Sequence, residues 1–158
     1  MERKLGIFSG EKVYSLVALL TVDEVTNLFT VGITILVARP NLVYIPESAM
    51  FVRTGAKYLT APGNINIKYD TVSAAVLAMD KSALTDTNGN AFWMTNQHTA
   101  AGASDIATSV GGKALIVSAA TGNPTVDADS PGSPVSIHLL TRIMPNKYEL
   151  IGQEYRLE

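Results

Sequence analysis

The sequence predicts an all-β fold, an antiparallel jelly-roll or β-sandwich with an extended N-terminal arm and a C-terminal tail. Short apolar runs rich in β-branched residues recur roughly every 8 to 12 residues and end at turn residues. One of them, Ile65–Asp70, alternates apolar and polar side chains, as a strand with one buried face does. The amphipathic helices that βαβ units require are missing from the pattern. We divide the chain into an arm or short helix (1–24), a jelly-roll domain (25–145) and a tail (146–158).

The composition favours a protein that other proteins cover. Charged residues make up 16% of the 158 residues and hydrophobic residues 47%, whereas soluble domains average roughly 25% charged. The formal net charge is −2 and no basic cluster is present, so we expect neither a nucleic-acid nor a membrane partner. Cysteine is absent, which removes disulfides, thiol nucleophiles and cysteine metal sites. We expect no cofactor.

The first half of the chain predicts a short opening segment and then strands. Apolar residues at positions 13, 16, 17 and 20 fit one helical face, so a helix is slightly preferred over an extended arm. Thr30–Ala38 is predicted as a strand because it is rich in β-branched residues. Leu42–Ile45, closed by Pro46, and Met50–Arg53 are predicted as two further strands.

The second half contains one ambiguous segment and two clear strands. Val72–Leu84 is compatible with a helix or a strand, and Asn88-Gly89 predicts a tight hairpin turn before a strand at 91–95. A surface segment follows from 96 to 109, with a helical turn near 104–106. Strands at 113–119 and 135–144 are joined by Thr121–Pro134, whose glycines and prolines predict an exposed loop.

Few residues suggest chemistry. His98 and His138 each lack a neighbouring histidine or carboxylate, so we interpret His138 as a half-exposed strand residue and His98 as a loop residue. Asp127 and Asp129 could hold a hard cation, but a solvated loop is the preferred interpretation. Trp93 is interpreted as a core or interface residue in preference to a sugar-stacking platform. We therefore predict that the protein is not an enzyme.

Several segments together resemble the jelly-roll cement or decoration proteins of tailed bacteriophage heads. The segments that carry the resemblance are Thr26–Val31, Ile45-Pro46, Ala61–Tyr69, Gly112–Val117, Thr121–Pro124 and Val135–Leu139. The resemblance implies a virion structural protein on the outer surface of the head, made in the bacterial host cytoplasm. It also implies that the protein binds the major capsid protein and itself, as a homotrimer, and stabilises the capsid shell between major capsid subunits.

The two apolar ends of the chain are predicted to contact neighbouring subunits. The candidate interface residues are Val13, Tyr14, Leu16, Val17, Tyr148, Leu150, Tyr155 and Leu157. One alternative is a receptor- or carbohydrate-binding domain of a phage tail fibre or tip, using Trp93, Tyr58 or the loop from Asp127 to Pro134. A weaker alternative is a cupin-type enzyme, which would need more clustered histidines than this chain offers.

Overall fold

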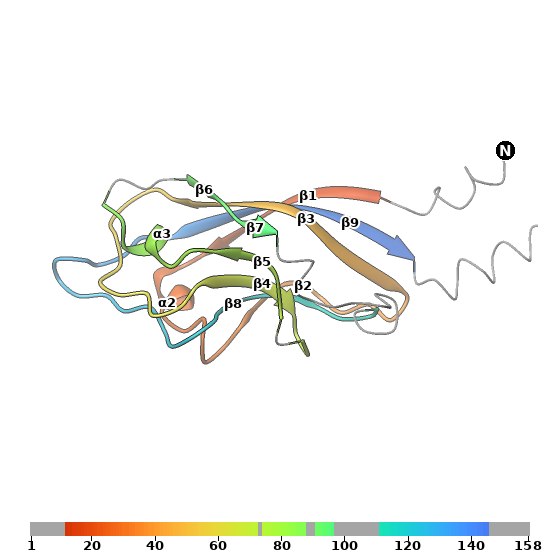
Figure 1. The fold of residues 1–158 in the computed structure, drawn as a ribbon, viewed down its shortest axis with the longest axis horizontal. Coiled ribbons are helices and arrows are strands. Elements are labelled where there is room, and N and C mark those ends of the chain that lie inside the picture. The colour runs from red at the N-terminus through yellow and green to blue at the C-terminus, as the bar shows by residue number, and fades with distance from the viewer. Residues whose placement is uncertain (1–11, 73, 88–90, 97–110, 146–158) are drawn as a thin grey trace, which may run out of the picture.

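Two antiparallel sheets pack face to face in the computed structural model of the chain, which describes residues 12–72, 74–87, 91–96 and 111–145 (Figure 1). The first sheet has the order β1-β9-β3-β6, with β1 at Lys12–Leu20, β3 at Leu42–Arg53, β6 at Ala91–Trp93 and β9 at Val135–Pro145. The second has the order β2-β8-β4-β5-β7, with β2 at Ile33–Leu36, β4 at Ile65–Tyr69, β5 at Ala75–Met79, β7 at Thr95–Asn96 and β8 at Leu115–Ala119. Two single-turn helices, α2 (Val22–Val25) and α3 (Ser82–Thr85), lie in the connections.

The strand order is that of a jelly roll. The first strand pairs with the last, β2 pairs with β8, β3 with β6 and β4 with β5, so the partners are nested along the sequence. A long antiparallel hairpin that is wound into two sheets gives this nesting. After β6 the chain crosses to the second sheet, where β7 pairs with β5. The predicted all-β sandwich is confirmed.

Strand β1 replaces the helix that was preferred near the N-terminus. Its nine residues pair with β9 without interruption, from Lys12 opposite Ile143 to Leu20 opposite Val135. Leu16, Ala18 and Leu20 pack toward the core, and the residues between them face outward. The helical prediction is wrong because both faces of this strand carry apolar residues, which hides the alternation. Residues 1–11 lie outside the described part of the chain.

Strand β3 runs through Pro46, so the prediction of two strands here is also wrong. A β-bulge between Pro46 and Ser48 adds Glu47 to β3, and ladder hydrogen bonds are interrupted at a bulge, which is why proline is tolerated there. Before the bulge an even-numbered residue, Tyr44, points into the core, and after the bulge an odd-numbered residue, Phe51, does so. The extra residue shifts the alternation by one position, so that the same face of β3 stays buried along the whole strand.

The remaining predictions have mixed outcomes. The strands at 65–69, 115–119 and 135–145 are confirmed, and the ambiguous Val72–Leu84 segment contains both β5 and α3. Of the predicted strand at Thr30–Ala38, only Ile33–Leu36 forms β2. The Asn88-Gly89 turn and the helical turn near 104–106 lie outside the described residues, as does the 146–158 tail.

The loop Thr121–Pro134 is more tightly held than an exposed loop. Isolated β-bridges join Thr125 to Thr60 and Pro131 to Tyr58, and the side chain of Asn123 accepts a hydrogen bond from the backbone N–H of Phe29 at 2.8 Å. Ser130 and Ser133 are buried. The loop thus seals one end of the sandwich, and the prediction that it is exposed holds only for part of it.

A buried arginine ties the end of β3 to α3. Arg53 is 1% exposed, and its guanidinium donates to three backbone carbonyls: Nε to Ala83 at 3.3 Å, Nη1 to Gly55 at 2.6 Å, and Nη2 to Asp86. All three acceptors are backbone oxygens, and they lie in two segments: Gly55 just after β3, and Ala83 and Asp86 in α3 and at its C-terminal end. Arg53 acts as a clamp at this end of the molecule.

We expect Arg53→Met to lower the free energy of unfolding by about 3 kcal/mol, because it leaves three carbonyls, one of them on the buried residue Ala83, without their charged donor. Arg53→Lys should cost less, since it keeps the charge but not the planar fork. Urea denaturation followed by circular dichroism measures both. The control is Arg39→Met, which removes an exposed arginine. If Arg39→Met and Arg53→Met lowered the free energy of unfolding equally, the proposed stabilising role of Arg53 would be contradicted.

Candidate interaction surface

The outer face of the β1-β9-β3-β6 sheet collects apolar side chains from four strands. The strand registers place Val17 opposite His138, His138 opposite Met50, and Met50 opposite Trp93. Residues directly opposite each other in antiparallel strands point to the same face. These four side chains therefore form one continuous row across the sheet.

This face holds five of the eleven exposed large apolar side chains of the described residues. Their exposed fractions are Val13 58%, Val17 58%, Leu19 71%, Trp93 73% and Leu140 40%. Scattered exposed apolar residues are ordinary, but five on one sheet face mark a candidate contact surface, although Ser136, His138 and Ser15 lie directly opposite three of them. We call this group the outer apolar face.

The outer face of the second sheet has a different character. There Asn66 lies opposite Ser118, and Lys68 lies opposite Ile116, which in turn lies opposite Thr34. Polar side chains dominate these rows, as on the solvated face of an ordinary antiparallel sheet. The sandwich is therefore asymmetric, with one apolar and one polar outer surface.

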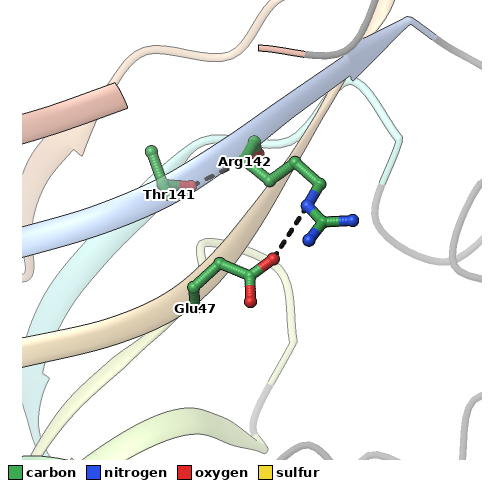
Figure 2. A network of polar contacts seen from close by, with 3 residues as sticks. All are labelled: Glu47, Thr141 and Arg142. Atoms are coloured by element: carbon green, nitrogen blue, oxygen red, sulfur yellow. Dashed lines mark hydrogen bonds and ion pairs between the residues drawn. The ribbon is translucent and has the colours of Figure 1, made fainter. Parts of the chain in front are cut away.

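The charged side chains on the outer apolar face, among the described residues, lie at one end of it. Nε of Arg142 lies 2.8 Å from Oε1 of Glu47, the bulge residue, and both side chains remain more than a third exposed (Figure 2). An exposed pair of this kind contributes about 0 to 1 kcal/mol. Near the centre of the face, His138 Nε2 lies 3.1 Å from Ser136 Oγ. This polar pair lies on one strand, and its His138 is the second member of the row from Val17 to Trp93.

The predicted interface residues divide into three groups. Val13, Tyr14 and Val17 are exposed on β1, whereas Leu16 faces inward and packs against the core. The four candidates of the tail, Tyr148, Leu150, Tyr155 and Leu157, lie outside the described residues. Their role as interface residues stays a prediction.

Sequence reasoning missed part of this surface. Leu19 and Leu140 were not singled out, and Trp93 was interpreted only as core or interface in general. The sequence pattern that could have identified this surface is the set of apolar residues at even positions of Val135–Met144 and at odd positions of β1. Reading the first segment as a strand would have revealed it.

Tyr58 is buried and unavailable to a ligand, which contradicts its use in a carbohydrate site. It is 0% exposed, and its hydroxyl donates to the carbonyl of Ser133 at 2.8 Å. Burial raises its pKa to about 12, although Arg53 acts in the opposite direction. Tyr58 is thus a structural link between two end loops.

The carboxylates and histidines are not grouped into a metal centre in the described part of the chain. Asp127 Oδ1 accepts the backbone N–H of Ser130 at 2.6 Å, which makes it a turn residue. His138 is half-buried on its strand, as predicted, and His98 lies outside the described residues. Among the helices that the structure describes, none is long and apolar enough to cross a membrane.

By its strand order and its layers the protein is a jelly-roll β-sandwich. No protein-family model matches the chain, and no curated protein does. Among solved structures, a chain of the cyanophage Pam1 capsid asymmetric unit is similar, with 9% sequence identity and a TM-score of 0.47 over 85% of this chain and 84% of that chain. At this level the similarity carries no functional argument, so the argument below uses the residues of this chain.

Stability should fall at alkaline pH because of two buried tyrosines. Burial raises the pKa of Tyr58 and Tyr69 to about 12, and the Tyr69 hydroxyl donates to the carbonyl of Tyr44 at 2.5 Å. In the unfolded chain both lose their protons near pH 10. Their contribution is therefore fully present below about pH 10 and is lost as the pH rises toward 12, by as much as about 2.5 kcal/mol each.

Urea denaturation at pH 9 and pH 11.5 measures this loss, with tyrosine ionisation followed by absorbance. The variant Tyr69→Phe should lose less stability between these two pH values than the wild type. An equal loss in both proteins would show that Tyr69 does not contribute.

Proposed function

We propose that the protein is a structural component of a virion and binds capsid subunits through the outer apolar face. The observation that carries this proposal is the group of five exposed apolar side chains on the outer face of a sheet whose inner face already forms the core. A surface of this kind suits lasting contact with another protein, because apolar side chains and a few uncharged polar ones can be desolvated at a lower cost than charged ones.

In its finer form the proposal is a cement or decoration protein on the outer surface of the phage head, lying between subunits of the major capsid protein. The resemblance of Ala61–Tyr69 and Val135–Leu139 to that family supports it. So does the low fraction of charged residues, 16%. A shell under internal pressure needs broad contacts repeated by symmetry, and a sheet face provides them.

The binding free energy that such contacts supply is large enough to stabilise a shell. Burying a fully exposed Val or Leu side chain contributes about 1.5 to 3 kcal/mol before ordering costs. Trp93 adds a large aromatic surface, and tryptophan is enriched among residues that dominate binding energy. A few such residues for each copy stabilise a shell because the contact recurs many times.

The proposed role is not enzymatic. Ser136 Oγ lies 3.1 Å from His138 Nε2, but among the described residues no hydrogen bond or ion pair joins His138 to a carboxylate that would orient it. General acid–base catalysis needs a base that is oriented by a further group beside a bound substrate. The geometry of the outer apolar face fits adhesion and offers no such arrangement.

Binding to capsid shells tests the proposal. Shells assembled from the major capsid protein encoded nearest to this gene should bind the wild type in cosedimentation and then withstand a higher temperature. We expect Leu140→Glu combined with Trp93→Ser to raise Kd by more than about tenfold, because both changes lie on the outer apolar face.

The matched control for the shell experiment is Val37→Glu, which introduces a charge at a residue that is 61% exposed and lies away from this face. It should bind like the wild type. Failure of the wild type to bind shells would overturn the proposal.

A second candidate function is a receptor- or carbohydrate-binding domain of a phage tail fibre or tip. Trp93, 73% exposed at the edge of a sheet, favours it because sugars stack on exposed indole rings. Glycan-array binding that is present in the wild type and lost in Trp93→Ala would support this function. Absence of glycan binding together with shell binding would exclude it.

A further inference from the structure

Among the strands that the structure describes, β1 lies at an edge of its sheet and lacks the features that keep edge strands from pairing. It pairs with β9 on one side over nine residues without a bulge. It contains no proline, and its single charged residue is Lys12, the first of the strand. Natural edge strands usually carry a charge, a proline or a bulge, because half of their N–H and C=O groups point outward and invite another strand.

The sequence of β1 is complementary to itself. In an antiparallel pair related by a two-fold axis perpendicular to the sheet, both outer faces stay on the same side, so odd residues oppose odd residues. The register that uses all nine residues is centred on Leu16 and sets Lys12 opposite Leu20 of the partner subunit. Shifts by two residues in either direction leave the ends of the strand without a partner.

This register brings exposed apolar side chains of the two copies together on both faces, while Ser15 lies opposite Val17 of the partner subunit. On the outer face Val13 would meet Leu19 of the partner subunit, which covers residues that are 58% and 71% exposed. On the inner face Tyr14, still 42% exposed, would lie beside the small side chain of Ala18 of the partner subunit. Cross-strand pairs are favoured when a large side chain lies opposite a small one and when both side chains are apolar.

We propose that β1 pairs with β1 of a second copy of this chain, so that two four-stranded sheets join into one continuous antiparallel sheet. A second copy is the partner that the observations favour, because the edge is uncharged over Val13–Leu20 and a strand of identical sequence fills it from end to end. The pairing closes with two copies, whereas the family resemblance implies three.

The inference goes beyond the virion role and does not depend on it. In the pair, the outer apolar faces of both copies become one surface, with β6 and Trp93 at its two far edges. Edge pairing buries the backbone and side chains of β1, while the β9 and β3 rows stay accessible. The dimer could then bind a larger partner with both faces at once.

Disulfide trapping tests the register directly, since the chain contains no cysteine of its own. Residues opposite each other have Cα atoms about 4.5 to 5.5 Å apart, within reach of a disulfide. A mixture of Val13→Cys and Leu19→Cys chains should form a disulfide-linked dimer on mild oxidation. Neither variant should do so alone, because its two cysteines would lie about 20 Å apart.

A charge exchange tests the same contact without oxidation. Val13→Glu combined with Leu19→Glu places like charges opposite each other twice and should raise the dimer Kd by more than about tenfold. Val13→Glu combined with Leu19→Lys changes the same positions but pairs opposite charges, so it should remain dimeric. Light scattering after size exclusion measures the mass against 16.8 kDa for one chain.

Three results would overturn the inference. They are a monomeric or trimeric wild type, cross-linking of Val13→Cys alone, and equal masses for the two charge variants. Each of them leaves shell binding to be judged separately, because the shell experiment uses Leu140 and Trp93, which belong to β9 and β6 and not to β1. A dimer that does not bind shells would support the edge pairing and contradict the virion role.

Discussion

Strand β9 fixes both surfaces of its sheet, because it pairs along its length with β1 on one side and with β3 on the other. Its odd residues from Val135 to Leu139 point into the core, so its even residues must face outward. A slip of one residue would exchange the two sets. The bulge at Glu47 keeps β3 in step with this alternation over its whole length. The apolar core and the outer apolar face are thus consequences of a single register.

Both faces of the first sheet are apolar, and this distinguishes it from the second. An antiparallel sheet needs one apolar face to form a sandwich, and the polar rows of Asn66 and Lys68 on the second sheet show the ordinary arrangement. The additional apolar residues on the first sheet add nothing to the core that the described residues form. They raise the cost of exposure to water, which is relieved when further groups cover them. The proposed contact with other subunits would account for this asymmetry.

Strands in which apolar and polar residues alternate could be predicted from the sequence, whereas features without this local alternation could not. Ile65–Tyr69 was recognisable because its inner face is apolar and its outer face polar, and the last two strands of the domain, which lie in different sheets, were bounded by clear turns. Strand β1 was hidden because a strand with two apolar faces has the same composition as a helical face. Pro46 suggested a strand end, since the bulge that accommodates it depends on β9, which is distant in sequence. The burial of Tyr58 likewise depends on Ser133, a contact between two loops that no local pattern encodes.

The rigidity of the sandwich ends bears on how the outer apolar face can bind. Arg53 joins β3 to the α3 segment through the carbonyls of Ala83 and Asp86, and Tyr58 joins the neighbouring loop to Ser133. These links are far in sequence from β1, yet they tie the end of β3 in the first sheet to the segment that follows β5 in the second. A preformed surface loses little conformational entropy when it binds, so more of its apolar area appears as affinity. The same argument applies to β1, because β9 already holds it extended and a second strand would add hydrogen bonds without having to order the first.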